Sequence, residues 1–173
     1  MQEPKEIWVK KEIVIHKNAK QLLRIWRNFE NLPRILHFLE NVIHISSHVS
    51  RWTSLLADQT ERIIWDVRIV EEHENRLEWH SENNPDIFHR GILILTPKPD
   101  SSTLLQLRLL FFFPLLHDSK PDMLGSDFSY RIEEDLQRFR LAVEANEFIN
   151  AQSTLKEIPE GFADPENPRK PLL

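Results

Sequence analysis

The chain has 173 residues, of which 40% are hydrophobic, with no cysteine and a formal net charge of −5. Length and apolar content predict a single domain with a substantial core. The lack of cysteine excludes disulfides, thiolate nucleophiles and cysteine-ligated zinc. The basic residues are scattered among acidic ones, which argues against a nucleic-acid binder.

Neither the N-terminus nor the apolar stretches of the chain predict a membrane segment. The first ten residues contain no apolar run of the kind found in signal peptides and anchors. The longest apolar stretch, from Leu104 to Leu116, is interrupted by Gln106 and Arg108. It is also far shorter than the roughly 20 residues that a membrane span requires. We therefore expect a cytoplasmic protein.

The N-terminal part predicts one strand followed by two short helices. Residues Val9 to Ile15 alternate as a strand with one buried face does, with Lys11 as the charged exception on that face. An Asn-x-x-Gln capping pattern begins at Asn18 and leads into apolar residues at helical spacing. A second short helix is expected from Asn31, with Pro33 in its first turn.

Between residues 41 and 113 the apolar pattern changes to period two and predicts six further strands. Short turn clusters separate them, and connections this short join antiparallel neighbours. The predicted strands are Val42 to His48, Arg51 to Leu56, Arg62 to Glu72, Arg76 to Glu82, Ile87 to Leu95 and Thr103 to Phe113.

The segment from Ser129 to Phe148 returns to helical period. Its apolar face carries Ile132, Leu136, Phe139 and Val143, and charged residues occupy the opposite face. Asn146 is the residue expected to adopt the left-handed conformation that ends such a helix. The order of elements predicts an α+β fold with one antiparallel sheet and helices on one of its faces.

The last part of the chain differs in composition from the rest. Residues 151–173 contain four prolines and little periodicity, which predicts an extended or disordered tail. We therefore divide the chain into a domain of residues 1–150 and a Pro-containing tail of residues 151–173.

Several short segments of the chain carry a resemblance to a known family. The first is Trp26-Arg27-Asn28-Phe29-Glu30-Asn31-Leu32-Pro33. The later segments are Trp52, Ile64-Trp65-Asp66, Asn75 to Ser81, Asp86-Ile87 with Gly91, and Glu134 to Arg140. In this order, over about residues 9 to 150, they resemble the bacterial polyketide cyclase/dehydrase-like proteins of the SRPBCC (START-like) superfamily.

This resemblance implies a helix-grip fold, in which a curved antiparallel sheet of seven strands surrounds a long C-terminal helix. It also implies a cavity suited to lipids, isoprenoids or polyketides. Fold alone does not establish an activity. The chain departs from the family pattern in the loop from Phe113 to Leu116 and at Asn146, where the family has glycine.

Strand periodicity selects residues that would line such a cavity if the tryptophans face inward. The alternative is that the same residues fill an ordinary core. The predicted cavity set is Trp65, Val67, Trp79, Ser81, His89, Leu93, Leu107, Leu109, Phe111, Phe139 and Val143.

Two residues of this set are polar and could hydrogen-bond to a ligand. Ser81 and His89 can each meet the polar head of a ligand, and His89 is also the one weak candidate for a catalytic acid or base. The alternative for His89 is a histidine hydrogen-bonded by backbone or water.

The sequence predicts neither a metal site nor a cofactor. His44 and His48 lie four residues apart on a predicted strand, which is too distant to chelate readily. Three glycines in the whole chain leave no Gly-rich phosphate loop, and no serine stands in a nucleophile-elbow pattern.

An apolar outer surface is the remaining feature. Leu110 and Phe112 lie on the parity opposite the predicted cavity, and Leu115 and Leu116 extend the apolar surface into the next loop. Contiguous exposed apolar side chains are typical of surfaces that contact another protein or a membrane. A second copy of the chain, a membrane or the tail of this chain would cover them.

Three functions remain open from the sequence. The first is binding or carriage of a hydrophobic small molecule, which is also the expected partner. The second is a cyclase or dehydratase that uses His89. The third is a non-catalytic interaction domain with a filled core. The apolar cavity set and the scarcity of inward ionisable groups favour the first.

Overall fold

The computed structural model describes residues 5–55, 61–84, 87–113, 124, 127–148, 163–164 and 167–171. The chain begins with a strand, continues through short helices into six more strands, and then forms a long helix. The elements are β1 (Lys5–Ile15), α1 (Ala19–Arg27), the 3-10 helix η1 (Phe29–Asn31), α2 (Leu32–Ile35), β2 (Leu39–His44), β3 (Val49–Leu55), β4 (Arg62–His73), β5 (Arg76–Glu82), β6 (Phe88–Pro97), β7 (Thr103–Phe113), α3 (Phe128–Glu144), β8 (Ala163–Asp164) and β9 (Asn167–Pro171).

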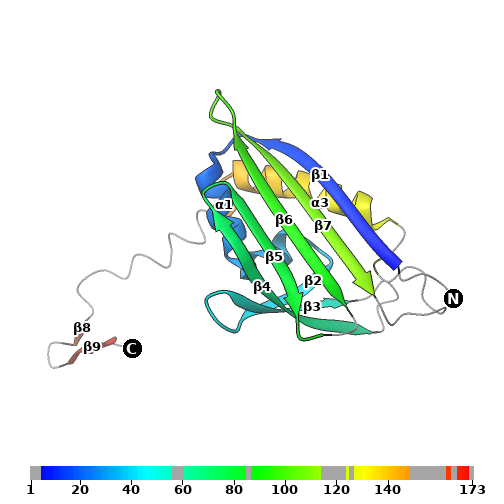
Figure 1. The fold of residues 1–173 in the computed structure, drawn as a ribbon. Helices are drawn as coiled ribbons and strands as arrows, with labels where there is room; N and C mark the ends of the chain where they lie inside the picture. Colours follow the sequence, from blue (N-terminus) through cyan, green and yellow to red (C-terminus); the bar gives the residue numbers. More distant parts are fainter. Residues whose placement is uncertain are drawn as a thin grey trace.

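Seven strands form one antiparallel sheet in the order β1-β7-β6-β5-β4-β3-β2. Consecutive strands from β2 to β7 are neighbours, and the last of them, β7, also pairs with β1. The sheet curls, and α3 lies across its concave face (Figure 1). This arrangement confirms the predicted α+β class and the helix-grip architecture.

Helix α1 begins where the capping pattern predicts. The side chain of Asn18 accepts a hydrogen bond from the backbone N–H of Gln21 at 2.9 Å, which satisfies one of the free donors of the first turn. Leu22, Ile25 and Trp26 are buried on one side of the helix. The helix therefore docks through a single apolar face.

Helix α3 also buries the predicted face. Ile132, Leu136, Phe139 and Val143 are all buried. The helix ends at Glu144 rather than at Phe148, and Asn146 takes the positive φ of 61° that was expected to end it. The chain is helical again at Glu147 and Phe148, so the predicted range includes a break at Ala145 and Asn146.

Strand β2 differs most from its prediction. It spans Leu39–His44 instead of Val42 to His48, because the backbone N–H groups of Ile45 and Ser46 both donate to the carbonyl of Val49 and turn the chain. Ile43 and Ile45 are 44% and 50% exposed, so their apolar alternation did not mark a buried face.

Both edges of the sheet carry features that oppose pairing with another sheet. Strand β2 is short, and its register with β3 shifts between Leu39 and Asn41. On β1, Lys11 points toward the concave side, where its Nζ lies 3.1 Å from Glu133 Oε2 of α3. This ion pair explains why a charged residue occupies an inward position.

The tail is described only in part. Strands β8 and β9 pair antiparallel. The other residues of the predicted tail lie outside the described residues.

Candidate functional site

The predicted cavity set lies on the concave side of the sheet and on the facing side of α3. Ten of its eleven residues are buried, with exposures between 0 and 2%, and Ser81 is half-buried. Trp65 and Val67 come from β4, Trp79 and Ser81 from β5, His89 and Leu93 from β6, Leu107, Leu109 and Phe111 from β7, and Phe139 and Val143 from α3.

Three aromatic members of the set, Trp65, Trp79 and Phe111, gather around His89 together with Trp52 of β3, which the predicted set did not include. The ring of His89 stacks on Phe111 with centroids 4.3 Å apart, and Trp52 and Trp65 lie at 5.4 and 6.0 Å. Trp79 completes this group at 6.4 Å. We call Trp52, Trp65, Trp79, His89 and Phe111 the aromatic cluster.

Other elements close over the aromatic cluster. Phe29 of η1 packs against Trp52 and Trp79, with both centroid distances 5.3 Å. Phe128 at the start of α3 meets Phe111 at 5.6 Å. The short helices and α3 thus cover the same part of the sheet.

Both ring nitrogens of His89 have partners inside the protein. Trp79 Nε1 donates to His89 Nε2 at 3.0 Å, and Nδ1 of His89 lies 3.0 Å from the carbonyl oxygen of Leu110. Since a carbonyl can only accept, Nδ1 carries the proton and the ring is neutral. The backbone N–H of His89 donates to Ser81 Oγ at 2.8 Å.

Burial lowers the pKa of His89 from 6.5 to about 3, against the opposing effect of its hydrogen bond to Leu110. The imidazole is therefore neutral near pH 7, and its lone pair is occupied by Trp79. A general base needs a free lone pair, and a general acid needs a proton that it can release to substrate. This geometry argues against a catalytic His89.

Gly91 makes the position of Trp79 possible. The two residues face each other across β5 and β6, and the indole lies over the place where a Cβ of residue 91 would stand. The pattern of alternating large side chains did not reveal this requirement.

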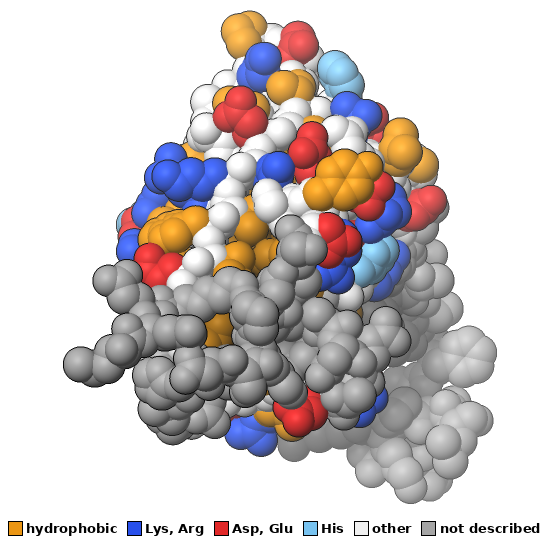
Figure 2. All heavy atoms as spheres, turned by 90° about the vertical axis from the view of Figure 1, so that its right-hand side faces the viewer, with side chains coloured by type: hydrophobic (Ala, Val, Ile, Leu, Met, Phe, Trp, Pro, Cys, Tyr) orange, Lys and Arg blue, Asp and Glu red, His pale blue; other side chains and the backbone are white. Residues whose placement is uncertain are grey.

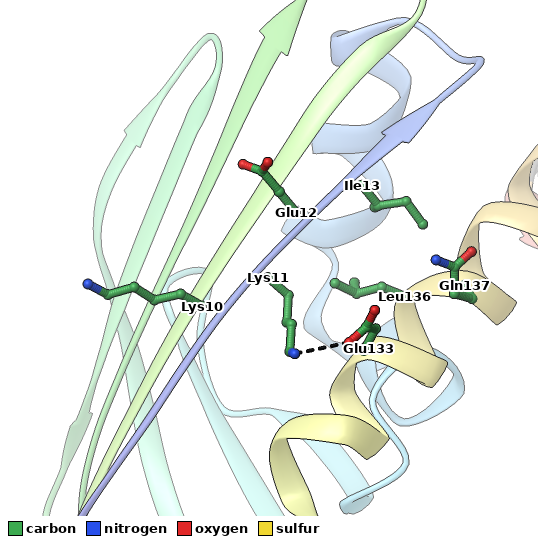
Figure 3. A pocket seen from close by; sticks show the side chains of 7 residues that line it. All are labelled: Lys10, Lys11, Glu12, Ile13, Glu133, Leu136 and Gln137. Atoms are coloured by element: carbon green, nitrogen blue, oxygen red, sulfur yellow. Dashed lines mark hydrogen bonds and ion pairs between the residues drawn. The ribbon is translucent and has the colours of Figure 1, made fainter.

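A pocket of about 250 Å³ lies between β1 and α3. Lys11 and Ile13 project from β1 toward the helix, while Lys10 and Glu12 point to the other side of the strand (Figure 3). The ion pair of Lys11 with Glu133 crosses this pocket. Its lining is largely polar and includes no member of the predicted cavity set.

A second pocket, of about 140 Å³, lies where the start of α3 meets the segment after α2. Asp135, 2% exposed, lies at this junction, where its Oδ2 accepts the backbone N–H of His37 at 3.0 Å. Its Oδ1 pairs with Arg138. Asp135 thus fastens the helix to the α2–β2 connection.

By sequence, the chain matches neither a protein family profile nor a curated protein. Solved structures resemble it strongly in fold. DR_A0006 from Deinococcus radiodurans has a TM-score of 0.66 and 23% identity, over 81% of this chain and 99% of that chain. A START superfamily protein from Mycobacterium smegmatis has a TM-score of 0.59 and 16% identity, over 80% and 95% of the two chains.

The chain adopts the START-like helix-grip fold. The di-domain ARO/CYC BexL from the BE-7585A biosynthetic pathway shares this fold, with a TM-score of 0.54 and 19% identity over 80% of this chain and 46% of that chain. At these identities the likeness concerns the fold. The predicted cavity set occupies the face of this START-like sheet over which α3 lies.

The outer side of the START-like sheet carries an apolar surface at one end. Leu110 and Phe112 are half-buried there, and their cross-strand partners Trp8 and Phe88 are 52% and 40% exposed. Leu115 and Leu116 lie outside the described residues. Figure 2 views the molecule from the right-hand side of Figure 1, and on the part of that side not drawn in grey, hydrophobic and charged side chains are interspersed.

A carboxylate on the same outer side was not anticipated. Burial alone would raise the pKa of Glu78, but hydrogen bonds from His80, Arg90 and Arg76 lower it. Arg90 Nε and His80 Nε2 lie 2.8 and 3.0 Å from Glu78 Oε1. This cluster ties β5 to β6 on the outer face.

Among the described residues, no group of three or more histidine, aspartate or glutamate side chains has the arrangement of a metal site. His44 instead contacts Asn28, and His48 contacts Ser47. Within the same part of the chain, no helix combines the length and apolar character needed to cross a membrane.

Proposed function

We propose that this protein binds or carries a hydrophobic small molecule, such as a lipid, an isoprenoid or a polyketide-like compound, between α3 and the concave face of the sheet. The observation that carries the proposal is the chemistry of this face. In the predicted cavity set between these elements, every side chain is apolar or aromatic except Ser81 and His89, and His89 is neutral and hydrogen-bonded. Such a lining suits a ligand with little charge.

The relatives in fold are consistent with this proposal. One is called a START superfamily protein and another a di-domain ARO/CYC from a biosynthetic pathway. A cyclase or dehydratase is the enzymatic alternative. We rank it lower, because both nitrogens of His89 are engaged within the protein.

A non-catalytic interaction domain with a filled core is the third candidate, and one observation favours it. The predicted cavity set is packed ring against ring, with centroid separations such as 4.3 Å between His89 and Phe111. Ligand binding then requires the interior to open at this face. Ligand titration separates the two candidates.

The test is a titration with a fluorescent fatty acid and with an isoprenoid quinone. On β4, Val67 is fully buried on the concave side and Ile64 is 51% exposed on the other face. Val67→Trp fills the proposed site and should abolish saturable binding, whereas Ile64→Trp should leave it intact. If Val67→Trp does not fold, Val67→Ala enlarges the site and should shift preference toward longer ligands. No saturable binding to the wild-type protein would contradict the proposal.

A further inference from the structure

The buried tryptophans differ in how their indole N–H groups are satisfied. Trp52 Nε1 donates to Ser50 Oγ at 2.8 Å, and Trp79 Nε1 donates to His89 Nε2 at 3.0 Å. Trp26 Nε1 and Trp65 Nε1 are equally buried and have no hydrogen-bond partner. Two of these four donors therefore remain without an acceptor.

A buried indole N–H without a partner is unfavourable, because it has lost water and gained nothing in exchange. The group can donate but cannot accept. A partner for it must therefore bring a lone pair, such as the oxygen of a carbonyl, ester, ether or hydroxyl group.

Trp65 stands in the aromatic cluster, next to the residues of the proposed site. Its ring lies 6.0 Å from both Trp52 and His89. The nitrogens of His89 offer it no acceptor, since one carries a proton and the other already accepts from Trp79. His89 therefore cannot accept a hydrogen bond from the indole N–H of Trp65.

The position of Trp65 along its strand is also informative. It lies near the start of β4, while His89 lies near the start of β6 and Phe111 near the end of β7. In this antiparallel sheet those strand ends meet at one end of the fold (Figure 1). The unpaired donor thus lies toward one end of the concave face.

We propose that Trp65 Nε1 is the polar anchor of the site and donates a hydrogen bond to an acceptor oxygen of the bound molecule. This inference rests on the proposed function and narrows it. The ligand class becomes apolar molecules that carry a carbonyl or another oxygen acceptor, in place of plain hydrocarbons. Trp65 takes the role that the sequence analysis gave to His89.

The experiment compares two probes with one carbon skeleton, 9-fluorenone, which has a carbonyl oxygen, and fluorene, which has a CH₂ group there. Equilibrium dialysis measures the affinity of both probes for the wild-type protein, Trp65→Phe and Trp26→Phe. Phenylalanine keeps an aromatic ring and removes the N–H. Trp26→Phe is the matched control, because it removes the other unpaired donor. Thermal unfolding checks that each variant is folded.

In Trp65→Phe, the affinity for fluorenone relative to fluorene should fall roughly three- to tenfold, the size of one neutral hydrogen bond. Trp26→Phe should leave this ratio unchanged. An equal change for both probes in Trp65→Phe, or a changed ratio in Trp26→Phe alone, overturns the assignment.

A measurement on the wild-type protein needs no variant. The ¹H–¹⁵N resonance of the Trp65 indole, assigned through its contacts with His89, should move downfield with fluorenone and stay in place with fluorene. Binding of both probes without this shift overturns the anchor but leaves the proposed function standing. Failure of both probes to bind would contradict the proposed function, and this inference with it.

Discussion

The indole of Trp79 occupies the space that a side chain at Gly91 would need. A Cβ at residue 91 would overlap Cε2 and Cζ2 of Trp79. Both atoms belong to a fully buried ring that also donates to His89. The absence of a side chain at one position of β6 therefore sets the position of a tryptophan on β5.

Gly91→Ala should destabilise the protein by about 1–3 kcal/mol, since overpacking forces buried side chains out of their preferred conformations. Urea unfolding measures the change. In a Trp79→Leu background, the same substitution should cost clearly less, because the clashing ring is gone. An equal loss in both backgrounds would show that contact with Trp79 is not the cause.

Buried His89 should make stability depend on pH. Its pKa is about 3 in the folded protein, against 6.5 as the ordinary value. Between these values the unfolded chain binds a proton that the folded protein does not bind. The free energy of unfolding should therefore be unaffected above pH 6.5 and fall as the pH is lowered below it, by up to about 1.4 kcal/mol per pH unit.

This slope is best measured by urea unfolding between pH 5 and 7, above the range in which carboxylates titrate. His89→Gln can keep an acceptor for Trp79 and a donor for Leu110 but has no group that titrates in this range. The slope should be smaller in this variant. An identical slope in both proteins would mean that His89 does not account for it.

Phe139 should be a major contributor to the packing of α3 against the rest of the domain. It is 2% exposed and packs against Trp26 and Phe148 with centroids 5.8 and 5.5 Å apart. Phe139→Ala should cost about 3–5 kcal/mol in chemical unfolding. Leu141→Ala, on the same helix at 63% exposure, should change stability by less than about 0.5 kcal/mol. Similar losses for both variants would argue against this helix orientation.

The carboxylate of Asp135 should hold α3 to the segment after α2. Asp135→Asn weakens the bonds to the His37 backbone and to Arg138, and should lower the free energy of unfolding by about 1–3 kcal/mol. Hydrogen exchange of the His37 amide should rise as well. Glu134→Gln, an exposed neighbour, is the control. Unchanged protection of His37 in Asp135→Asn would contradict this tether.

Local patterns in the sequence predicted most of the fold. β5 and β7 have the predicted bounds, and Asn18 caps α1 as its spacing to Gln21 indicates. Strand and helix periodicity also predicted which side chains of the cavity set are buried, with Ser81 as the half-buried exception. These features depend on neighbours within a few residues, so the sequence alone carries them.

What the sequence could not predict depends on residues that are distant along the chain. Lys11 looked out of place because its partner Glu133 is 122 positions away. His89 looked like a ligand contact because no local sequence pattern shows that its ring nitrogens bond to Trp79 and to the carbonyl of Leu110. The unpaired N–H of Trp65 likewise becomes visible only when the neighbouring acceptors are known.

Ligand binding is tested most directly by native mass spectrometry of the protein purified from cells, followed by solvent extraction and identification of what is released. We expect a retained apolar molecule that carries an oxygen acceptor, bound at one copy per chain and absent from Val67→Trp. Protein that is free of any such molecule, and that binds no fatty acid, isoprenoid quinone or aromatic ketone when these are added, would contradict the proposed function.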